Sequence, residues 1–541
     1  MKKKAPPIGN AQFKIVREMG YYYIDKSLLI KDYIESGDTV TLITRPRRFG
    51  KTLNMTMLRE FFDITADSRA LFDGLAIMDT EYSGYINTRP VVFLSFKDCQ
   101  ANTPASLTYD INFIVKEEYK KYYEILRVED ADRYESFFSA YDKLKGDFPD
   151  INILKHSIAI LEKTLAMYYK INPIVLIDEY DQPILSSYEY GYYNEMKTFF
   201  SGFYGAALKD QEFMSQAMLT GIQRVAKESI FSQLNNINVY TVLNEKYSGY
   251  FGFTAAEASD LLAYYNLTLD DSVIQKYNGY IFGGVEIYNP WSLLCYACAG
   301  IMDNYWINTS TNFLIKSSID DADELFHESF QSLISEGVAT VGADLHCSFI
   351  ELKDDSTLWG LLINAGYVTV TGQVDSYILK VKIPNDEVAS EFIKIVASQA
   401  RIQDTDLRIM LQCLQRKDMD GFFAIYRKIV VACTSYFDAK ENAYHMLFLG
   451  MCISLRGMYK ITSNIEAGYG RSDIRLESSS PERPHIIIEF KQGDDVEALK
   501  NDALRQIIKN EYYADLRGEI LCVGIAHKNK KCSLAYKTLH N

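Results

Sequence analysis

The tripeptide Gly50-Lys51-Thr52 constrains the fold of this chain more than any other segment, because of what flanks it. Before it comes the β-branched run 39–43, and after it segment 53–62 has the apolar spacing of a helix. A strand, a tight turn and a helix in this order place backbone N–H groups at a helix N-terminus, where they favour phosphate. We therefore expect Lys51 to reach the β- and γ-phosphates of a nucleotide and the Thr52 hydroxyl to bind Mg²⁺.

The residues that lead into this turn complete the candidate phosphate-binding loop, or P-loop. They are Arg45, Pro46, Arg47, Arg48 and Phe49. The first glycine of the common pattern falls on Arg45. A side chain at that position must point away from the nucleotide, or the turn must differ. The alternative interpretation is a basic surface turn whose three arginines stay solvated.

A second apolar run, 173–177, ends in Asp178 and Glu179. In P-loop enzymes a buried strand of this kind holds Mg²⁺ through its aspartate, and the following glutamate activates the attacking water. We expect Asp178 to bind the metal and Glu179 to act as the general base. The alternative is a charged strand end that faces solvent.

A further strand candidate ends in Thr220, and Arg224 follows it closely. A polar residue at this place commonly senses the γ-phosphate, so Thr220 is the candidate sensor. Arg224 is positioned to reach a phosphate in its own or a neighbouring subunit. The alternative for both residues is an ordinary strand end.

Strand candidates alternate with helical segments through the first half of the chain. Strands are expected at 39–43, 91–96, 174–177 and 217–220, and helices over most of 106–170. This alternation predicts an α/β fold with a parallel sheet covered on both faces. At 541 residues the chain is too long for one core. We expect a P-loop domain over 1–253, a helical lid and mixed linker region over 254–420, and a C-terminal α/β domain over 421–541.

A second candidate site lies in the last third of the chain, at Asp473, Glu489 and Lys491. The last two follow an apolar run, and on a period of two they point to the same face of a strand. Two carboxylates hold a hard cation through oxygen, and a lysine beside them can orient or deprotonate a water for attack on phosphorus. The pattern predicts a Mg²⁺ site at Asp473 and Glu489. The alternative is a solvated strand pair in a regulatory domain.

Secondary structure around this second site is expected to alternate as well. A helix is expected from about 441 to 456, strands at about 473–477 and 485–490, a helix over about 496–516, and a last strand at 520–525.

Five strings in the first 300 residues carry a resemblance to a known family. They are Tyr23-Ile24-Asp25-Lys26, the loop from Arg45 to Thr52, the strand end from Ile177 to Asp181, Tyr277-Asn278-Gly279-Tyr280, and Tyr288-Asn289-Pro290-Trp291-Ser292. Together they resemble the bacterial AAA-ATPase-like family, over about residues 8–300. That family also lacks the first loop glycine, so the resemblance makes Arg45 a family trait. It implies ATP and Mg²⁺ as cofactors, and ATP hydrolysis as the activity.

The C-terminal pattern resembles the PD-(D/E)XK nuclease superfamily, in the subgroup that commonly follows this ATPase domain. Asp473 and Glu489 match its acidic positions and Lys491 its lysine, with Ser472 in place of the usual proline. Glu441 matches the acidic residue on the preceding core helix. On the following helix, Gln506 and Tyr512 or Tyr513 occupy positions where the superfamily often faces residues toward the site. The resemblance implies a restriction-endonuclease-like α/β domain.

The formal net charge of −14 argues against a protein that coats nucleic acid without specificity, although a local basic groove stays compatible with it. Nine cysteines are scattered, and the only close pair is Cys295 with Cys298. The second pair or the nearby histidines of a zinc site are missing, which favours buried thiols in a reducing cytosol. No apolar stretch reaches the length of a membrane span. We expect a cytoplasmic protein.

Two functions are compatible with these patterns. The first is an ATPase coupled to a Mg²⁺-dependent nuclease that cleaves DNA, in preference to RNA, in defence or mobile-element biology. The second is a nucleotide-dependent switch or scaffold whose nuclease-like domain binds nucleic acid or a partner without cutting. ATP-dependent assembly into a homo-oligomer is expected under either, because P-loop enzymes often complete their site with a neighbour's arginine.

Overall fold

The computed structural model describes most of the chain. The described residues are 3–129, 132–146, 149–209, 212–224, 236–306, 322–335, 337–346, 354–399, 404–432, 448, 451–452, 455, 458–467, 470–528 and 531–541. The chain forms two compact units, Met1–Thr311 with Ala343–Val370, and Asn312–Gly342 with Thr371–Asn541. The region predicted as one middle part, 254–420, is therefore shared between the two units.

The core of the first unit is a five-stranded parallel sheet in the order β2-β3-β4-β1-β5. Its strands are β1 (Val40–Thr44), β2 (Val91–Ser95), β3 (Ile174–Asp178), β4 (Gln216–Gly221) and β5 (Ile237–Tyr240). The register pairs Ser95 with Asp178 and Thr44 with Gly221, so these carboxyl ends meet at one edge. The four predicted strands and the parallel sheet are confirmed. The half-exposed β5 was not predicted, because it lacks the continuous apolar run of a buried strand.

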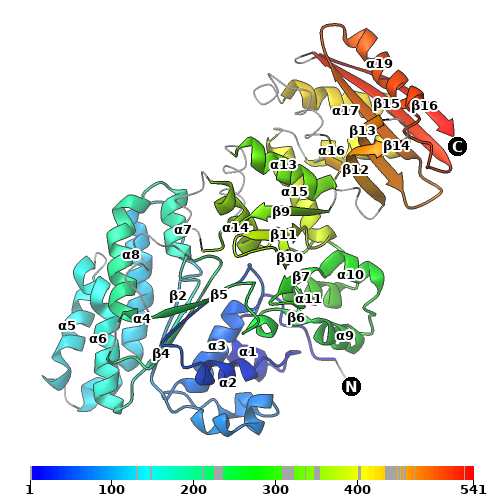
Figure 1. Ribbon diagram of the computed structural model, residues 1–541. Coiled ribbons are helices and arrows are strands. Elements are labelled where there is room, and N and C mark those ends of the chain that lie inside the picture. Colours follow the sequence, from blue (N-terminus) through cyan, green and yellow to red (C-terminus); the bar gives the residue numbers. More distant parts are fainter. Residues whose placement is uncertain are drawn as a thin grey trace. The chain divides into compact units, whose positions relative to one another are not determined.

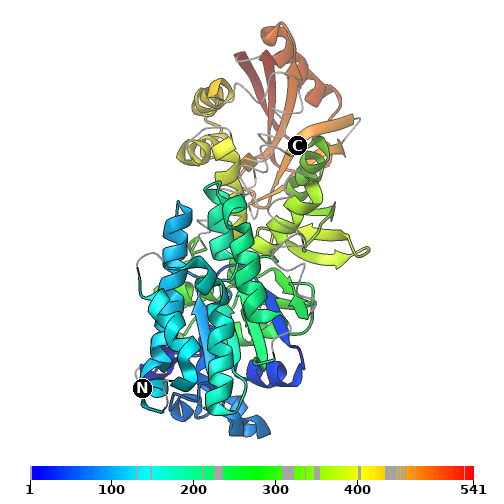
Figure 2. The same ribbon diagram turned by 90° about the vertical axis from the view of Figure 1, so that its left-hand side faces the viewer.

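Helices cover both faces of this sheet (Figures 1 and 2). On one face lies α3, which contacts β2, β3 and β4, while α4 and α6 contact β2 from the other. The helices are α1 (Phe13–Glu18), α2 (Leu28–Glu35), α3 (Lys51–Phe62), α4 (Pro104–Glu129), α5 (Glu135–Leu144), α6 (Ile151–Tyr169), α7 (Gln182–Glu189) and α8 (Tyr193–Leu208). Short 3₁₀ helices lie at Arg69–Phe72, Ala76–Asp79, Glu81–Tyr85, Asp132–Tyr134 and Ser248–Tyr250.

The region after the sheet, where the predicted helical lid and mixed linker region begins at 254, contains strands as well as helices. It holds a three-stranded sheet in the order β6-β8-β7, and its elements are β6 (Phe253–Thr254), α9 (Ala255–Tyr264), α10 (Asp271–Tyr277), β7 (Tyr280–Phe282), β8 (Val285–Tyr288) and α11 (Pro290–Ala299). Glycines at positive φ, Gly283 and Gly284, make the turn between β7 and β8. We call this part of the first unit the small-sheet lobe. The first unit also includes α14 (Asp355–Ala365).

The second unit is built on a five-stranded sheet in the order β12-β13-β14-β15-β16. Its strands are β12 (Tyr459–Ala467), β13 (Gly470–Ser478), β14 (His485–Gln492), β15 (Glu519–Lys528) and β16 (Lys531–His540), and α19 (Val496–Lys509) packs on β14 and β15. The unit also contains α13 (Glu324–Ser335), α15 (Asp386–Gln399), α16 (Asp404–Gln415) and α17 (Met419–Ala432). A smaller sheet, β10-β11-β9, consists of β9 (Val338–Gly342), β10 (Thr369–Gln373) and β11 (Ile378–Lys382).

The predicted strands and helix around the second candidate site are confirmed, with one change of length. The helix expected over 496–516 ends at Lys509, because Glu511 takes a left-handed conformation with φ 50° that no α-helix continues. The helix expected over 441–456 falls largely outside the described residues. Among the helices that the structure describes, none combines the length and the apolar character that a bilayer crossing requires.

Gly524 in β15 is the point of closest approach between α19 and the sheet. A Cβ atom there would lie 2.4 Å from the Lys500 carbonyl oxygen and 2.6 Å from the Leu504 backbone nitrogen. We expect Gly524→Ala to destabilise the second unit by about 1–3 kcal/mol, since backbone atoms cannot yield as a flexible side chain can. Thermal unfolding measures the effect. Gly372→Ala is the control, because its Cβ would meet only Lys380 carbons, at 3.7 Å. Equal melting temperatures for the two variants would contradict the prediction.

Glu162 on α6 is fully buried, and neither of its carboxylate oxygens has a hydrogen-bond partner. Desolvation raises its pKa well above the ordinary value of 4.5. The folded protein thus keeps a proton that the unfolded chain loses, so stability is fully present below pH 4.5 and falls as the pH rises. The parent chain is expected to lose stability as the pH rises above 4.5, with a limiting slope of about 1.4 kcal/mol per pH unit, and Glu162→Gln is expected to remove this loss.

Chemical unfolding of the full chain at several pH values tests this expectation. The matched control is Glu124→Gln on the neighbouring α4, where the Glu124 side chain is 74% exposed. That variant is expected to keep the pH dependence of the parent chain. The prediction is wrong if Glu162→Gln keeps it as well.

Candidate functional site

The P-loop segment forms a turn between β1 and the N-terminus of α3. Two of its residues have the left-handed backbone conformation, Arg48 with φ 68° and Gly50 with φ 82°. The Lys51 ammonium donates to the carbonyl oxygens of Arg45 and Pro46, at 3.1 Å each. The lysine therefore lies against the loop itself, at the helix N-terminus where backbone N–H groups favour an anion.

The side chain of Arg45 packs into the protein and does not line the cavity beside the loop. Its fully buried guanidinium donates through Nη1 to the carbonyls of Thr44 and Tyr240, at 2.8 and 3.0 Å. It also lies over the rings of Phe251 and Phe282, 5.7 and 5.3 Å from their centroids. Desolvation lowers its pKa to about 9. The sequence left two alternatives, a side chain that points away from the nucleotide or a different turn. In the structure the Arg45 side chain points away from the cavity beside the loop.

Three hydroxyl groups converge on the buried carboxylate of Asp178. Thr52 and Ser95 donate to Oδ2, at 2.8 and 3.1 Å, and Thr220 donates to Oδ1 at 2.8 Å. Desolvation, and secondly the charge of Glu179, raises the pKa of Asp178, while the hydroxyl groups act in the opposite direction. Sequence reasoning missed Ser95, although it ends a predicted strand at the same sheet edge and could have been found there.

Glu179 follows with a left-handed backbone, φ 52°, which is rare for a residue other than glycine. Its carboxylate lies 3.5 Å from the Lys51 ammonium. The next acid, Asp181, is fully buried and accepts the backbone N–H groups of Ile222 and Gln223 through Oδ2, at 2.8 and 3.0 Å. Desolvation raises the pKa of Asp181 to about 6. Asp181 thereby fixes the chain after β4 to the acidic end of β3, a role that the sequence did not indicate.

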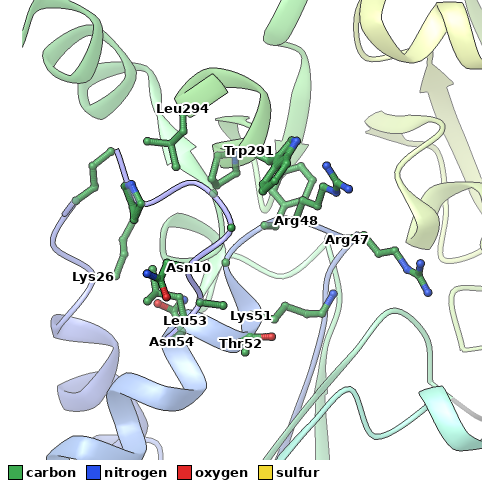
Figure 3. A pocket seen from close by; sticks show the side chains of 18 of the residues that line it. Asn10, Lys26, Arg47, Arg48, Lys51, Thr52, Leu53, Asn54, Trp291 and Leu294 are labelled. Atoms are coloured by element: carbon green, nitrogen blue, oxygen red, sulfur yellow. The ribbon is translucent and has the colours of Figure 1, made fainter. Parts of the chain in front are cut away.

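A cavity of about 530 Å³ opens beside the loop (Figure 3). Seven of the predicted residues line it: Arg47, Arg48, Phe49, Gly50, Lys51, Thr52 and Glu179. Five others do not: Arg45, Pro46, Asp178, Thr220 and Arg224. The Phe49 ring packs against the small-sheet lobe. Its centroid lies 4.9 Å from that of the Tyr280 ring and 5.1 Å from that of the Phe282 ring. Sequence reasoning missed Lys97, Gln100 and Gln182, which also line the cavity.

The second candidate site lies where β13 and β14 separate. Their antiparallel ladder runs from Leu476 to Ile474 and stops before Asp473. Beyond it, side chains replace ladder bonds: the Phe490 N–H donates to Asp473 Oδ2 at 2.7 Å, and the Asp473 N–H donates to Glu489 Oε2 at 3.3 Å. The structure thus brings the two predicted carboxylates together at the divergence of the strands.

Lys491 and α19 complete this site. The Lys491 ammonium lies 3.5 Å from Glu489 Oε1, and the Gln506 amide donates to the same oxygen. Gln506 also donates to the Tyr512 hydroxyl at 3.0 Å. Tyr512 is 1% exposed, so it supports Gln506 from within the core. Glu441 lies outside the described residues, and its place relative to the site stays a prediction.

Burial raises the pKa of both carboxylates of this site. Desolvation, and secondly the charge of Asp473, raises the pKa of Glu489 to about 8, and desolvation raises that of Asp473. A divalent cation would relieve this repulsion, so the two carboxylates fit Mg²⁺. Among the described residues, no group of three or more His, Cys, Asp or Glu could hold a metal ion. Two carboxylates suit Mg²⁺, which usually keeps several waters.

Known proteins match both parts of the chain. Residues 7–231 match the family described as "Predicted AAA-ATPase", and residues 439–537 match the PD-(D/E)XK nuclease superfamily. A curated relative, "Uncharacterized protein in vnfD 5'region" of Azotobacter chroococcum mcd 1, is 28% identical over 390 residues. This match covers 69% of the chain and 65% of the relative, so the chain spans about 65% of that protein's length.

The first matched range contains the P-loop and the acidic end of β3. The second contains Asp473, Glu489 and Lys491. The strings at 277–292 lie beyond the first match. The chain therefore carries an AAA-ATPase-like domain, followed by a C-terminal domain of the PD-(D/E)XK nuclease superfamily.

Proposed function

We propose that this protein binds and hydrolyses ATP at the P-loop and cleaves phosphodiester bonds of DNA at the site of Asp473. The observation that carries the nuclease half is the pair of carboxylates at the divergence of β13 and β14, with Lys491 beside them. A merely structural strand pair would not concentrate a buried acid, a partly buried acid and a lysine at the point where its ladder ends, because their desolvation is costly. We further propose a cytoplasmic location and ATP-dependent self-association.

At the first site, the turn and Lys51 would hold the phosphates, while Thr52 and Asp178 would hold Mg²⁺. The metal neutralises charge on the phosphates when it is bound. Glu179 lines the cavity and would accept a proton from the attacking water. Its left-handed backbone aims the side chain at the cavity, while the neighbouring Asp178 faces the hydroxyl groups.

At the second site, Asp473 and Glu489 would hold Mg²⁺, which supplies Lewis-acid stabilisation of charge on the phosphate. Lys491 would orient or deprotonate the attacking water. Gln506 positions Glu489 through its hydrogen bond to Oε1, so one oxygen of that carboxylate is fixed by α19. Lys491 is partly exposed, with 28% of its side chain accessible, so a nucleic acid strand can reach it.

The ATPase half is tested by two variants of the first unit. We expect Lys51→Ala to abolish measurable ATP binding, because it removes the cation that faces the phosphates. Glu179→Gln is expected to keep binding and to lower hydrolysis by about a hundredfold or more, since it removes only the proton acceptor. Nucleotide titration and phosphate release measure the two effects. Lys31→Ala on α2, where the Lys31 side chain is 41% exposed, is the control for charge. Hydrolysis that persists in Glu179→Gln would exclude its role as base.

The nuclease half is tested with plasmid, single-stranded DNA and RNA in Mg²⁺, with and without ATP. We expect DNA cleavage by the parent chain and a loss of about a hundredfold or more in Asp473→Asn and in Lys491→Ala. The control is Asp502→Asn on the outer face of α19, where the Asp502 side chain is 49% exposed.

Absence of cleavage in every condition, or cleavage that survives Asp473→Asn, would overturn the nuclease proposal. A nucleotide-dependent switch would then be the better description. In that case Lys51→Ala abolishes biological activity and Lys491→Ala leaves it unchanged.

A further inference from the structure

A short turn follows β2 at the carboxyl edge of the parallel sheet, and hydrogen bonds hold both of its ends. At its start the Phe96 N–H donates to the Asp178 carbonyl at 3.0 Å, so the chain stays paired with β3 for one residue beyond β2. At its end the Ser186 hydroxyl of α7 accepts the Ala101 N–H at 3.0 Å and donates to the Ala101 carbonyl at 3.1 Å. Lys97 lies in this turn, whose backbone is therefore fixed on two sides.

The side chains that lead into the turn alternate between the two faces of the sheet. The hydroxyl groups of Ser95 and Thr52 donate to the same Asp178 oxygen, so Ser95 faces the P-loop helix. The Phe96 ring instead packs against α8, which lies with α6 on the other face. Continued alternation places Lys97 on the face of Ser95. Lys97 accordingly lines the cavity beside the P-loop.

Lys97 also follows the strand position that neighbours the proposed general base. The carbonyl that pairs with the Phe96 N–H belongs to Asp178, and Glu179 is the next residue. The Glu179 carboxylate lies 3.5 Å from the Lys51 ammonium. Ligands of open parallel sheets bind outside the carboxyl ends of the strands. Lys51, Glu179 and Lys97 therefore flank the space in which the terminal phosphate of a bound nucleotide would lie.

The cations that line this cavity differ in what already holds them. All except Lys97 have a partner within the protein, namely Glu257 for Lys26, the loop carbonyls for Lys51, Gln182 for Arg47 and the Trp291 ring for Arg48. Lys97 is exposed, and the part of the chain that the structure describes offers it no hydrogen bond, ion pair or ring contact. Arg224, which the sequence offered as a phosphate ligand, does not line the cavity.

We propose that Lys97 is a catalytic residue of ATP hydrolysis and that its ammonium binds the γ-phosphate of the nucleotide held by the same chain. This inference rests on the proposed function, because it assumes that ATP lies on the P-loop. In the reaction the water oxygen bonds to the γ-phosphorus, and Glu179 accepts the water proton. The bond from the γ-phosphorus to the bridging oxygen breaks, which leaves ADP and inorganic phosphate. Lys97 donates to the non-bridging γ-oxygens and stabilises the charge of the transition state.

ATP titration and phosphate release by the full chain in Mg²⁺ test the proposal. We expect Lys97→Ala to lower kcat by about a hundredfold or more and to change ATP affinity by less than about threefold, because the lost cation acts mainly on the transition state. Lys97→Arg keeps the charge, so its kcat is expected to stay within about tenfold of the parent chain. The control is Lys120→Ala on α4, where the Lys120 side chain is 64% exposed and does not line the cavity.

A binding measurement gives a readout that does not depend on turnover. ADP with aluminium fluoride mimics the phosphoryl group in transfer, and transition-state mimics bind tighter than ground-state ligands. We expect the parent chain to bind ADP at least about tenfold tighter with aluminium fluoride than without it, and Lys97→Ala to lose this gain. Mixing Lys97→Ala with Lys51→Ala tests whether the lysine acts within its own chain, and the mixture is expected to stay inactive.

The possible failures of the two proposals can be told apart. Hydrolysis at the parental rate in Lys97→Ala would overturn the role of Lys97 and leave the proposed function intact. Hydrolysis restored in the mixture would also overturn it, because Lys97 would then act on the nucleotide of a neighbouring chain. If the parent chain neither binds nor hydrolyses ATP, the proposed function fails, and the role of Lys97 fails with it.

Discussion

One buried carboxylate, that of Asp178, joins the parts of the first site. Its two oxygens accept hydroxyl groups from the N-terminus of α3 and from the ends of β2 and β4. A charged group in this position is costly to bury, and three hydrogen bonds offset part of that cost. The strand ends and the P-loop helix therefore keep a common register, because any element that moved away would lose its hydrogen bond to Asp178. The acid that would hold the metal also holds the sheet edge together.

The second site uses carboxylates in a different structural way. Asp473 and Glu489 accept backbone N–H groups that the separating strands no longer pair with each other. The side chains that would bind a metal ion there also satisfy the backbone of the separating strands. Gln506 then reaches the site only because α19 lies close to the sheet at Gly524. Packing on one face of the sheet thus controls the geometry of the acidic groups at its end.

Sequence patterns predicted what depends on local order along the chain. The carboxyl ends of parallel strands meet at one edge, so Thr52, Asp178 and Thr220 could be placed together from spacing alone. The strands β12 and β16 were not predicted. β16 lies at an edge of its sheet and is mostly exposed, so its side chains lack the apolar pattern that marks a buried strand. The direction of the Arg45 side chain depends on its packing against β5 and the small-sheet lobe, which lie about 200 residues or more further along the chain. No local sequence pattern predicts such packing.

The buried guanidinium of Arg45 has a consequence for how phosphate loops are recognised. Its backbone continues β1, with the N–H bonded to the Gly221 carbonyl, and it is not among the residues with positive φ. The unusual backbone conformations of this loop fall on Arg48 and Gly50 instead. The backbone at position 45 therefore does not require a glycine, and a glycine there would leave a void beneath the small-sheet lobe. In this chain the loop and the lobe share one side chain, so their sequences are constrained to change together.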